Sequence, residues 1–129
     1  MKGLGFIWVL LAFAAVTFAA GIPYWRLPYA EINRGHFAIL PGALLLGFLT
    51  LILVVAEVAR VKPIAVTMLL CVPTIDVVSI IKDTATDPTS HNLWPFEMAI
   101  ATVFGALVVV PAVLIGLAAR WLMARMAQG

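Results

Sequence analysis

The hydrophobic positions of this chain fall in long continuous runs, not in an alternating pattern or a narrow helical stripe. Four runs cover residues 3–21, 37–59, 63–81 and 95–119. A helix that crosses a bilayer needs about 20 mostly apolar residues, and without water its backbone groups must be hydrogen-bonded within the segment. The pattern therefore predicts an all-α integral membrane protein, in which residues 1–129 form a single domain of four transmembrane helices.

The first run also has features of a cleaved signal peptide. Lys2 would be its charged start, and Thr17-Phe18-Ala19 is a tolerable small-x-small cleavage site. Its apolar stretch of about 19 residues, however, is longer than the usual signal core of about 7–15 residues. Cleavage would also leave an odd number of helices, so we expect the first helix to be retained.

The composition excludes an ordinary soluble domain. The chain is 64% hydrophobic and 11% charged, with a mean hydropathy of +1.14, whereas soluble domains are about 45–50% apolar and about 25% charged. The net charge of +2 does not imply a nucleic-acid partner, because basic residues placed for membrane orientation produce the same value. The lone Cys71 lies inside an apolar run and is expected to be a small core residue.

The basic residues predict the orientation of the helices, because cytoplasmic loops of membrane proteins carry more Lys and Arg. With a cytoplasmic N-terminus, that side holds Lys2, Arg60, Lys62, Arg120 and Arg125, and the other side holds Arg26, Arg34 and Lys82. Both termini are therefore expected in the cytoplasm, with the helices in two antiparallel hairpins. The compact hairpins suggest a bacterial inner membrane.

Aromatic and acidic residues fit this orientation. The tryptophans would form belts at the two interfaces, with Trp8 and Trp121 inside and Trp25 and Trp94 outside. Glu57 lies three residues before Arg60, a helical spacing that predicts a local ion pair at the cytoplasmic boundary.

The two expected outer connections, 22–36 and 82–94, are long and chemically varied, and such loops are more often functional than simple connectors. Their candidate binding residues are Tyr24, Trp25, Arg26, Glu31, His36, His91, Trp94 and Glu97. The stretch 91–97, HNLWPFE, also has an ordinary interpretation as a helix start at the membrane interface. Pro95 suits a first helical turn, and Glu97 lies near the positive end of the helix dipole.

Asp76 is the sharpest single feature, because it lies about five residues inside the outer end of the third helix, roughly 7.5 Å deep. An acid at that depth is a functional candidate by default. At helical spacing Asp76, Ser79 and Asp83 share one face, and Pro73 can kink the helix just below and leave a carbonyl free. Two interpretations remain open. Asp76 has a structural role, in a pair with Lys82 or Arg34 or in a hydrogen bond to another helix, or it acts directly in transport or in binding a ligand or partner.

Catalytic and metal signatures are weak. The histidines, with Glu31, Asp87 and Glu97, show no ligand spacing such as HxxxH or HxxE, so no cofactor is predicted and no metal set can be assigned. There is no nucleophile elbow and no glycine-rich phosphate loop. His91 with Asp87 or Glu97 is the one acid–base pair that an interfacial enzyme could use. Without a catalytic motif, an enzymatic function is not favoured.

Three classes of function remain. The first is a non-enzymatic accessory or assembly subunit that docks to other membrane subunits through its outer loops, and the second is a small oligomeric transport protein that uses Asp76. The third is an interfacial enzyme or cofactor binder. The small-xxx-small pairs that would allow close helix packing, within the bundle or in self-association, are Ala43/Gly47, Ala101/Gly105 and Ala112/Gly116.

Overall fold

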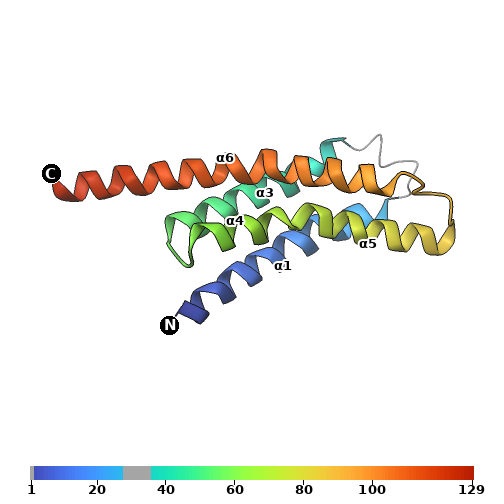
Figure 1. Ribbon diagram of the computed structural model, residues 1–129, viewed down its shortest axis with the longest axis horizontal. Coiled ribbons are helices and arrows are strands. Elements are labelled where there is room, and N and C mark those ends of the chain that lie inside the picture. Colours follow the sequence, from blue (N-terminus) through green and yellow to red (C-terminus); the bar gives the residue numbers. More distant parts are fainter. Residues whose placement is uncertain (1, 28–35) are drawn as a thin grey trace.

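The computed structural model describes residues 2–27 and 36–129, without the side chains of residues 2 and 36–39, and its regular elements are all α-helices (Figure 1). They are α1 (Lys2–Arg26), α3 (His36–Val55), α4 (Val61–Leu69), α5 (Cys71–Thr86) and α6 (Trp94–Gln128). Three segments are long and apolar enough to cross a membrane, namely Gly3–Arg26, Val61–Thr86 and Trp94–Gln128, and Leu40–Val55 is a shorter apolar helix. The all-helical, membrane-type chain is confirmed, and the fourth crossing stays a prediction.

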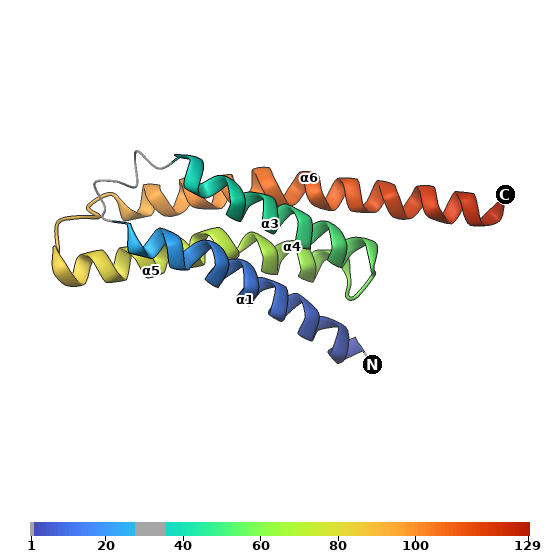
Figure 2. The ribbon, with the colours of Figure 1, turned by 180° about the vertical axis from the view of Figure 1, so that it is seen from behind.

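Both chain ends lie toward one end of the bundle, together with the α3–α4 turn, and the 87–93 turn lies at the opposite end (Figures 1 and 2). α6 packs mainly on α3 and α5, and α1 packs on the same two helices from the other side. The buried core draws on all the helices and also contains the fully buried Thr50. Its apolar members include Val9, Val16, Leu46, Val54, Ile64, Met68, Cys71 and Val109. The outward faces also carry large apolar side chains, such as Ile100 at 70% exposure and Leu107 at 69%, as a lipid environment requires.

The helix ends differ from the predicted boundaries. α1 and α5 continue as helices through 22–26 and 82–86, so both expected outer loops are shorter than predicted. α5 stops at Thr86 because Asp87 precedes a proline and takes an extended backbone, with φ −139° and ψ 102°. α6 extends past the other helices at its C-terminal end (Figures 1 and 2).

The third apolar run is interrupted in the middle, as Pro73 predicted. α4 ends at Leu69 and α5 begins at Cys71, and Pro73 has no N–H to donate to the Leu69 carbonyl one turn earlier. α6 passes close to this point, because a Cβ added to Gly105 would lie 3.1 Å from the Leu69 oxygen. Pro111, by contrast, lies inside α6 without interrupting it.

α3 ends at Val55, not at 59, because the chain turns through a left-handed residue. Glu57 has a φ of 54°, a conformation that costs a non-glycine residue roughly 1–2 kcal/mol. The predicted Glu57–Arg60 pair is wrong for this reason, since the two residues are not on one helix. Arg120 of α6 instead donates from Nε to Glu57 Oε1 at 2.9 Å.

Small residues lie where the helices approach most closely. A Cβ on Gly116 would lie 2.8 Å from Val54 of α3, and a Cβ on Gly42 would lie 2.7 Å from the Ala20 Cβ of α1. The tightest approach is at Gly5, where an added Cβ would lie 1.7 Å from the Val58 carbonyl oxygen in the α3–α4 turn. Gly5 therefore sets how near α1 lies to that turn.

Gly5→Ala is expected to lower the free energy of unfolding by about 1–3 kcal/mol, because the obstacle is backbone that cannot rotate away. Unfolding by SDS titration of the protein in mild detergent would measure it. Gly3→Ala is the matched control, since nothing lies within 4 Å of a Cβ there, and it should be neutral or slightly stabilising. Equal effects of the two substitutions would contradict the close contact.

Candidate functional site

Two of the three polar residues predicted to share a face of α5 form a buried contact. Ser79 is fully buried and Asp83 is 9% exposed. The Ser79 hydroxyl donates to Asp83 Oδ2 at 3.4 Å, across one helical turn. The helical register alone brings these two groups together.

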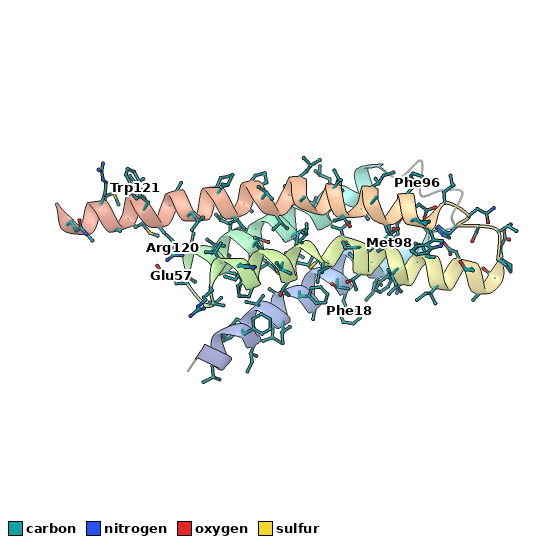
Figure 3. The ribbon with its side chains drawn as sticks, viewed as in Figure 1. Phe18, Glu57, Phe96, Met98, Arg120 and Trp121 are labelled. Atoms are coloured by element: carbon teal, nitrogen blue, oxygen red, sulfur yellow. The ribbon has the colours of Figure 1, made fainter. Side chains whose placement is uncertain are left out.

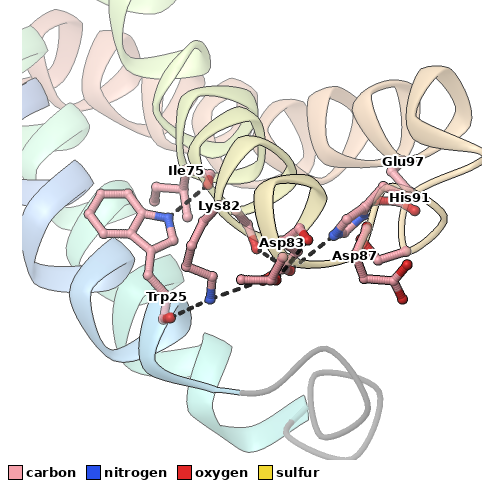
Figure 4. Close-up of polar contacts among 10 residues, drawn as sticks. Trp25, Ile75, Lys82, Asp83, Asp87, His91 and Glu97 are labelled. Atoms are coloured by element: carbon pink, nitrogen blue, oxygen red, sulfur yellow. Dashed lines mark hydrogen bonds and ion pairs between the residues drawn. The ribbon is translucent and has the colours of Figure 1, made fainter.

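His91 completes this contact from the turn between α5 and α6. Its side chain is only 3% exposed, and its Nε2 lies 3.0 Å from Asp83 Oδ2 while its Nδ1 lies 2.5 Å from Glu97 Oε2 (Figure 4). We call Asp83, His91 and Glu97 the His91 clamp. It joins α5 to the first turn of α6, so the imidazole holds the two helix ends together across the 87–93 turn.

Lys82 and Trp25 tie the end of α1 to the same region (Figure 4). The Lys82 ammonium lies 3.2 Å from Asp83 Oδ1 and donates to the Trp25 carbonyl at 2.5 Å. The Trp25 indole donates in turn to the Ile75 carbonyl at 2.9 Å. The Lys82 side chain is 41% exposed, so its ion pair with Asp83 adds little stability. The bond from Lys82 to the Trp25 carbonyl instead positions the end of α1.

Asp76 stands apart from these pairs. The predicted partner Lys82 is engaged by Asp83, which makes the Asp76–Lys82 pair wrong, and the alternative partner Arg34 lies outside the described residues. The buried Oδ2 of Asp76 has no hydrogen-bond partner within residues 2–27 and 36–129. Glu97 and His91 are the charged groups that act on it electrostatically. Thr17 Oγ1 is also buried without a partner among these residues, but a buried carboxylate oxygen is the more costly of the two.

The turn that carries His91 is shaped by Asp87. Its Oδ1 accepts hydrogen bonds from the Thr89 hydroxyl at 2.7 Å and the Thr89 N–H at 3.0 Å. These bonds hold the pKa of Asp87 below its ordinary value, and the Asx turn they form directs the chain toward His91. Asp87 is therefore a turn residue and not the acid–base partner of His91.

Burial disfavours a charged His91 ring, but the hydrogen bonds that the ring donates to Asp83 and Glu97, aided by the negative charges of these carboxylates, outweigh that effect. The pKa of His91 is raised above its ordinary value of 6.5. Both ring nitrogens are engaged by carboxylates, so neither is placed to take a proton from a substrate. The two carboxylates lie on opposite nitrogens of the ring, and in the described part of the chain no three His, Cys, Asp or Glu residues are arranged to hold a metal ion.

The remaining candidates of the outer face are Tyr24, Arg26, Glu31, His36 and Trp94. Arg26 and Trp94 are exposed, and Tyr24 is half-buried near the end of α1. His36 begins α3, but its side chain is not described, and Glu31 lies outside the described residues. Sequence reasoning paired His91 with Asp87 or Glu97 and missed its contact with Asp83, because a separation of eight residues across a turn has no fixed geometry.

Comparisons with protein-family models, with curated proteins and with solved structures found no match to this chain. Functional inference therefore depends on the geometry of the helices and their polar contacts.

The raised pKa of His91 makes stability depend on pH. The protonated ring stabilises the fold fully below pH 6.5, the unfolded value, and this contribution is lost as pH rises through the higher pKa of the folded protein. His91→Gln should remove this step and cost about 1.5–3 kcal/mol at acidic pH. Thermal unfolding midpoints across pH would measure both effects.

His36→Gln, which removes the other histidine of the chain, is the control. It should leave the step in place. A step that disappears in His36→Gln and persists in His91→Gln would contradict the assignment to the His91 clamp.

Proposed function

We propose that this chain is a small, non-enzymatic interaction or assembly subunit of a membrane complex, which docks through the end of the bundle that carries the His91 clamp. The supporting observation is a set of exposed apolar side chains in and beside the turn whose position the buried His91 clamp fixes. Leu93, Trp94 and Phe96 are 64%, 55% and 68% exposed, and they lie between or beside the clamp residues. Phe96 points away from the bundle (Figure 3).

The clamp favours docking over catalysis. Its histidine is engaged on both nitrogens, which leaves the acid–base chemistry of an interfacial enzyme without a ready base. A surface already fixed before binding loses less conformational freedom when a partner arrives. Aromatic side chains are enriched at the centres of protein interfaces. An interfacial enzyme or cofactor binder is the least supported of the three classes.

In the proposed arrangement four helices cross the membrane, with both termini in the cytoplasm and the His91 clamp on the extracytoplasmic side of a bacterial inner membrane. α3 supports the fourth crossing, because its 20 residues span roughly 30 Å, about the thickness of the hydrocarbon core. The excess of Lys and Arg on the side of the termini supports the orientation. The clamp end would then face partners whose own polar regions lie outside the cytoplasm.

The docking proposal predicts that gentle detergent extraction of the tagged protein recovers a larger membrane partner in fixed stoichiometry, identified by mass spectrometry. Trp94→Ala combined with Phe96→Ala should reduce recovery at least tenfold, since interface anchors contribute about 2 kcal/mol or more. Leu107→Ala is the control, because Leu107 is equally exposed on α6 at 69% but lies about three helical turns beyond Phe96. Recovery as a homo-oligomer alone would count against docking.

The second candidate is a small oligomeric transport protein, which the unpartnered Asp76 Oδ2 favours. An uncompensated carboxylate oxygen beside an interrupted helix is a place where a proton or cation can be held inside a membrane. The bundle is narrow, so a path would have to form between copies. Asp76 would line that path, with Ser79 and the His91 clamp toward its outer mouth.

Asp76→Asn tests this candidate in proteoliposomes. It should abolish proton or cation flux and leave extraction, folding and partner recovery unchanged, because a neutral amide of the same shape is cheaper to bury. Asp87→Asn is the matched control, since Asp87 bonds within its own turn and should keep its flux. Full flux through Asp76→Asn would remove Asp76 from any transport role.

A further inference from the structure

A cleft opens at the end of the bundle opposite the His91 clamp. Its volume is about 820 Å³, and it lies between the start of α1, the α3–α4 turn, the start of α4 and α6. Small-molecule sites have volumes of about 300–1,000 Å³. Phe6, Glu57, Arg60 and Arg120 contribute side chains to its wall, so the wall combines an aromatic ring with three charges.

The charges in the cleft do not balance. Arg120 uses Nε for the 2.9 Å bond to Glu57, and its two terminal nitrogens make no hydrogen bond to the residues that the structure describes. Arg60 is exposed and has no ion pair within the same residues. Two guanidinium groups therefore face one carboxylate, and the planar guanidinium fork matches the oxygens of a phosphate group.

The backbone adds donors to the same wall. Arg60 is the N-cap of α4 and supplies no side-chain cap, and the first backbone bond of this turn runs from Ile64 N–H to the Arg60 carbonyl at 3.3 Å. The N–H groups of Val61 and Lys62 precede that bond, and Val61 lines the cleft. Free N–H groups at the start of a helix favour an anion, in support of the two guanidinium groups.

We propose that this cleft binds the phosphate group of an anionic phospholipid. The apolar side chains beside the cleft favour a lipid over a soluble phosphate: Leu4 and Trp8 on α1 are 67% and 61% exposed, and Trp121 on α6 is 59% exposed. Trp121 lies beside Arg120 at the same end of the bundle as Glu57 (Figure 3). The Arg125 guanidinium lies over the Trp121 ring, 4.5 Å from its centroid. Acyl chains can follow the apolar helices while the headgroup enters the cleft, as in other basic pockets between membrane helices.

The test uses the full chain in an uncharged detergent, titrated with phosphatidylglycerol or with zwitterionic phosphatidylcholine, with bound lipid counted by native mass spectrometry. Titrations are repeated in about 1 M salt, where the Debye length is about 3 Å and general surface attraction is screened. We expect phosphatidylglycerol to bind at least tenfold more tightly than phosphatidylcholine. Inorganic phosphate at millimolar concentration separates a lipid site from a phosphate site.

Two variants with opposite expected effects keep the test independent of folding damage. Arg60→Gln should weaken phosphatidylglycerol binding about tenfold or more, whereas Glu57→Gln, which removes the competing carboxylate from Arg120, should strengthen it. Lys62→Gln is the matched control, because Lys62 carries the same charge on the same turn but does not line the cleft. Thermal unfolding confirms that each variant is folded.

If Arg60→Gln and Lys62→Gln weakened phosphatidylglycerol binding equally, the binding would depend only on general surface charge, and the proposal would be overturned. Weaker binding in Glu57→Gln, or equal affinity for the two lipids, would overturn it as well. Complete competition by free phosphate would show that the cleft recognises phosphate alone and not a lipid. Partner recovery does not enter this test, so it stands or fails separately from the docking proposal.

Discussion

The lack of water around most of an apolar helical chain is the constraint from which this structure follows. Backbone groups must be bonded inside each helix, and lipid tails compete equally well for apolar side chains, so apolar burial alone does not pull the helices together. What remains is close contact and a few polar bonds. The contacts lie at small residues, with Gly5 against the Val58 carbonyl and Gly116 against Val54, and the polar bonds gather at the two ends of the bundle.

The two ends of the bundle differ in how their charged side chains are paired. At the 87–93 end, the negative charges of Asp83 and Glu97 meet the buried imidazole of His91, so each of these three groups has a partner. At the other end, Glu57 meets only one of the two guanidinium groups in its cleft. A satisfied end is suited to hold a fixed surface, and an end with surplus positive charge is suited to attract an anion.

Between the ends, the break at Leu70 gives the middle of the bundle its irregular features. Pro73 cannot bond to the Leu69 carbonyl, and Gly105 lets α6 come close at that level. Asp76 follows within one turn of Pro73, with one oxygen buried and unpartnered among the described residues. The interruption at Leu70 and the unpartnered oxygen of Asp76 therefore lie within two helical turns of each other.

Local spacing and backbone bonding are enough to predict the membrane-type helices, the irregularity near Pro73 and the face shared by Ser79 and Asp83. The sequence also placed His91 and Glu97 at the start of the last helix. Which charged side chains form pairs depends on how the helices pack and on the path of the turns between them. Glu57 pairs with Arg120, 63 residues away, and not with Arg60, three residues away. The reason is that Glu57 has a left-handed backbone conformation, which glycine usually adopts, and therefore lies outside α3. His91 reaches Asp83 and Glu97 because the 87–93 turn folds back between two helices, and no periodicity in the sequence encodes that path.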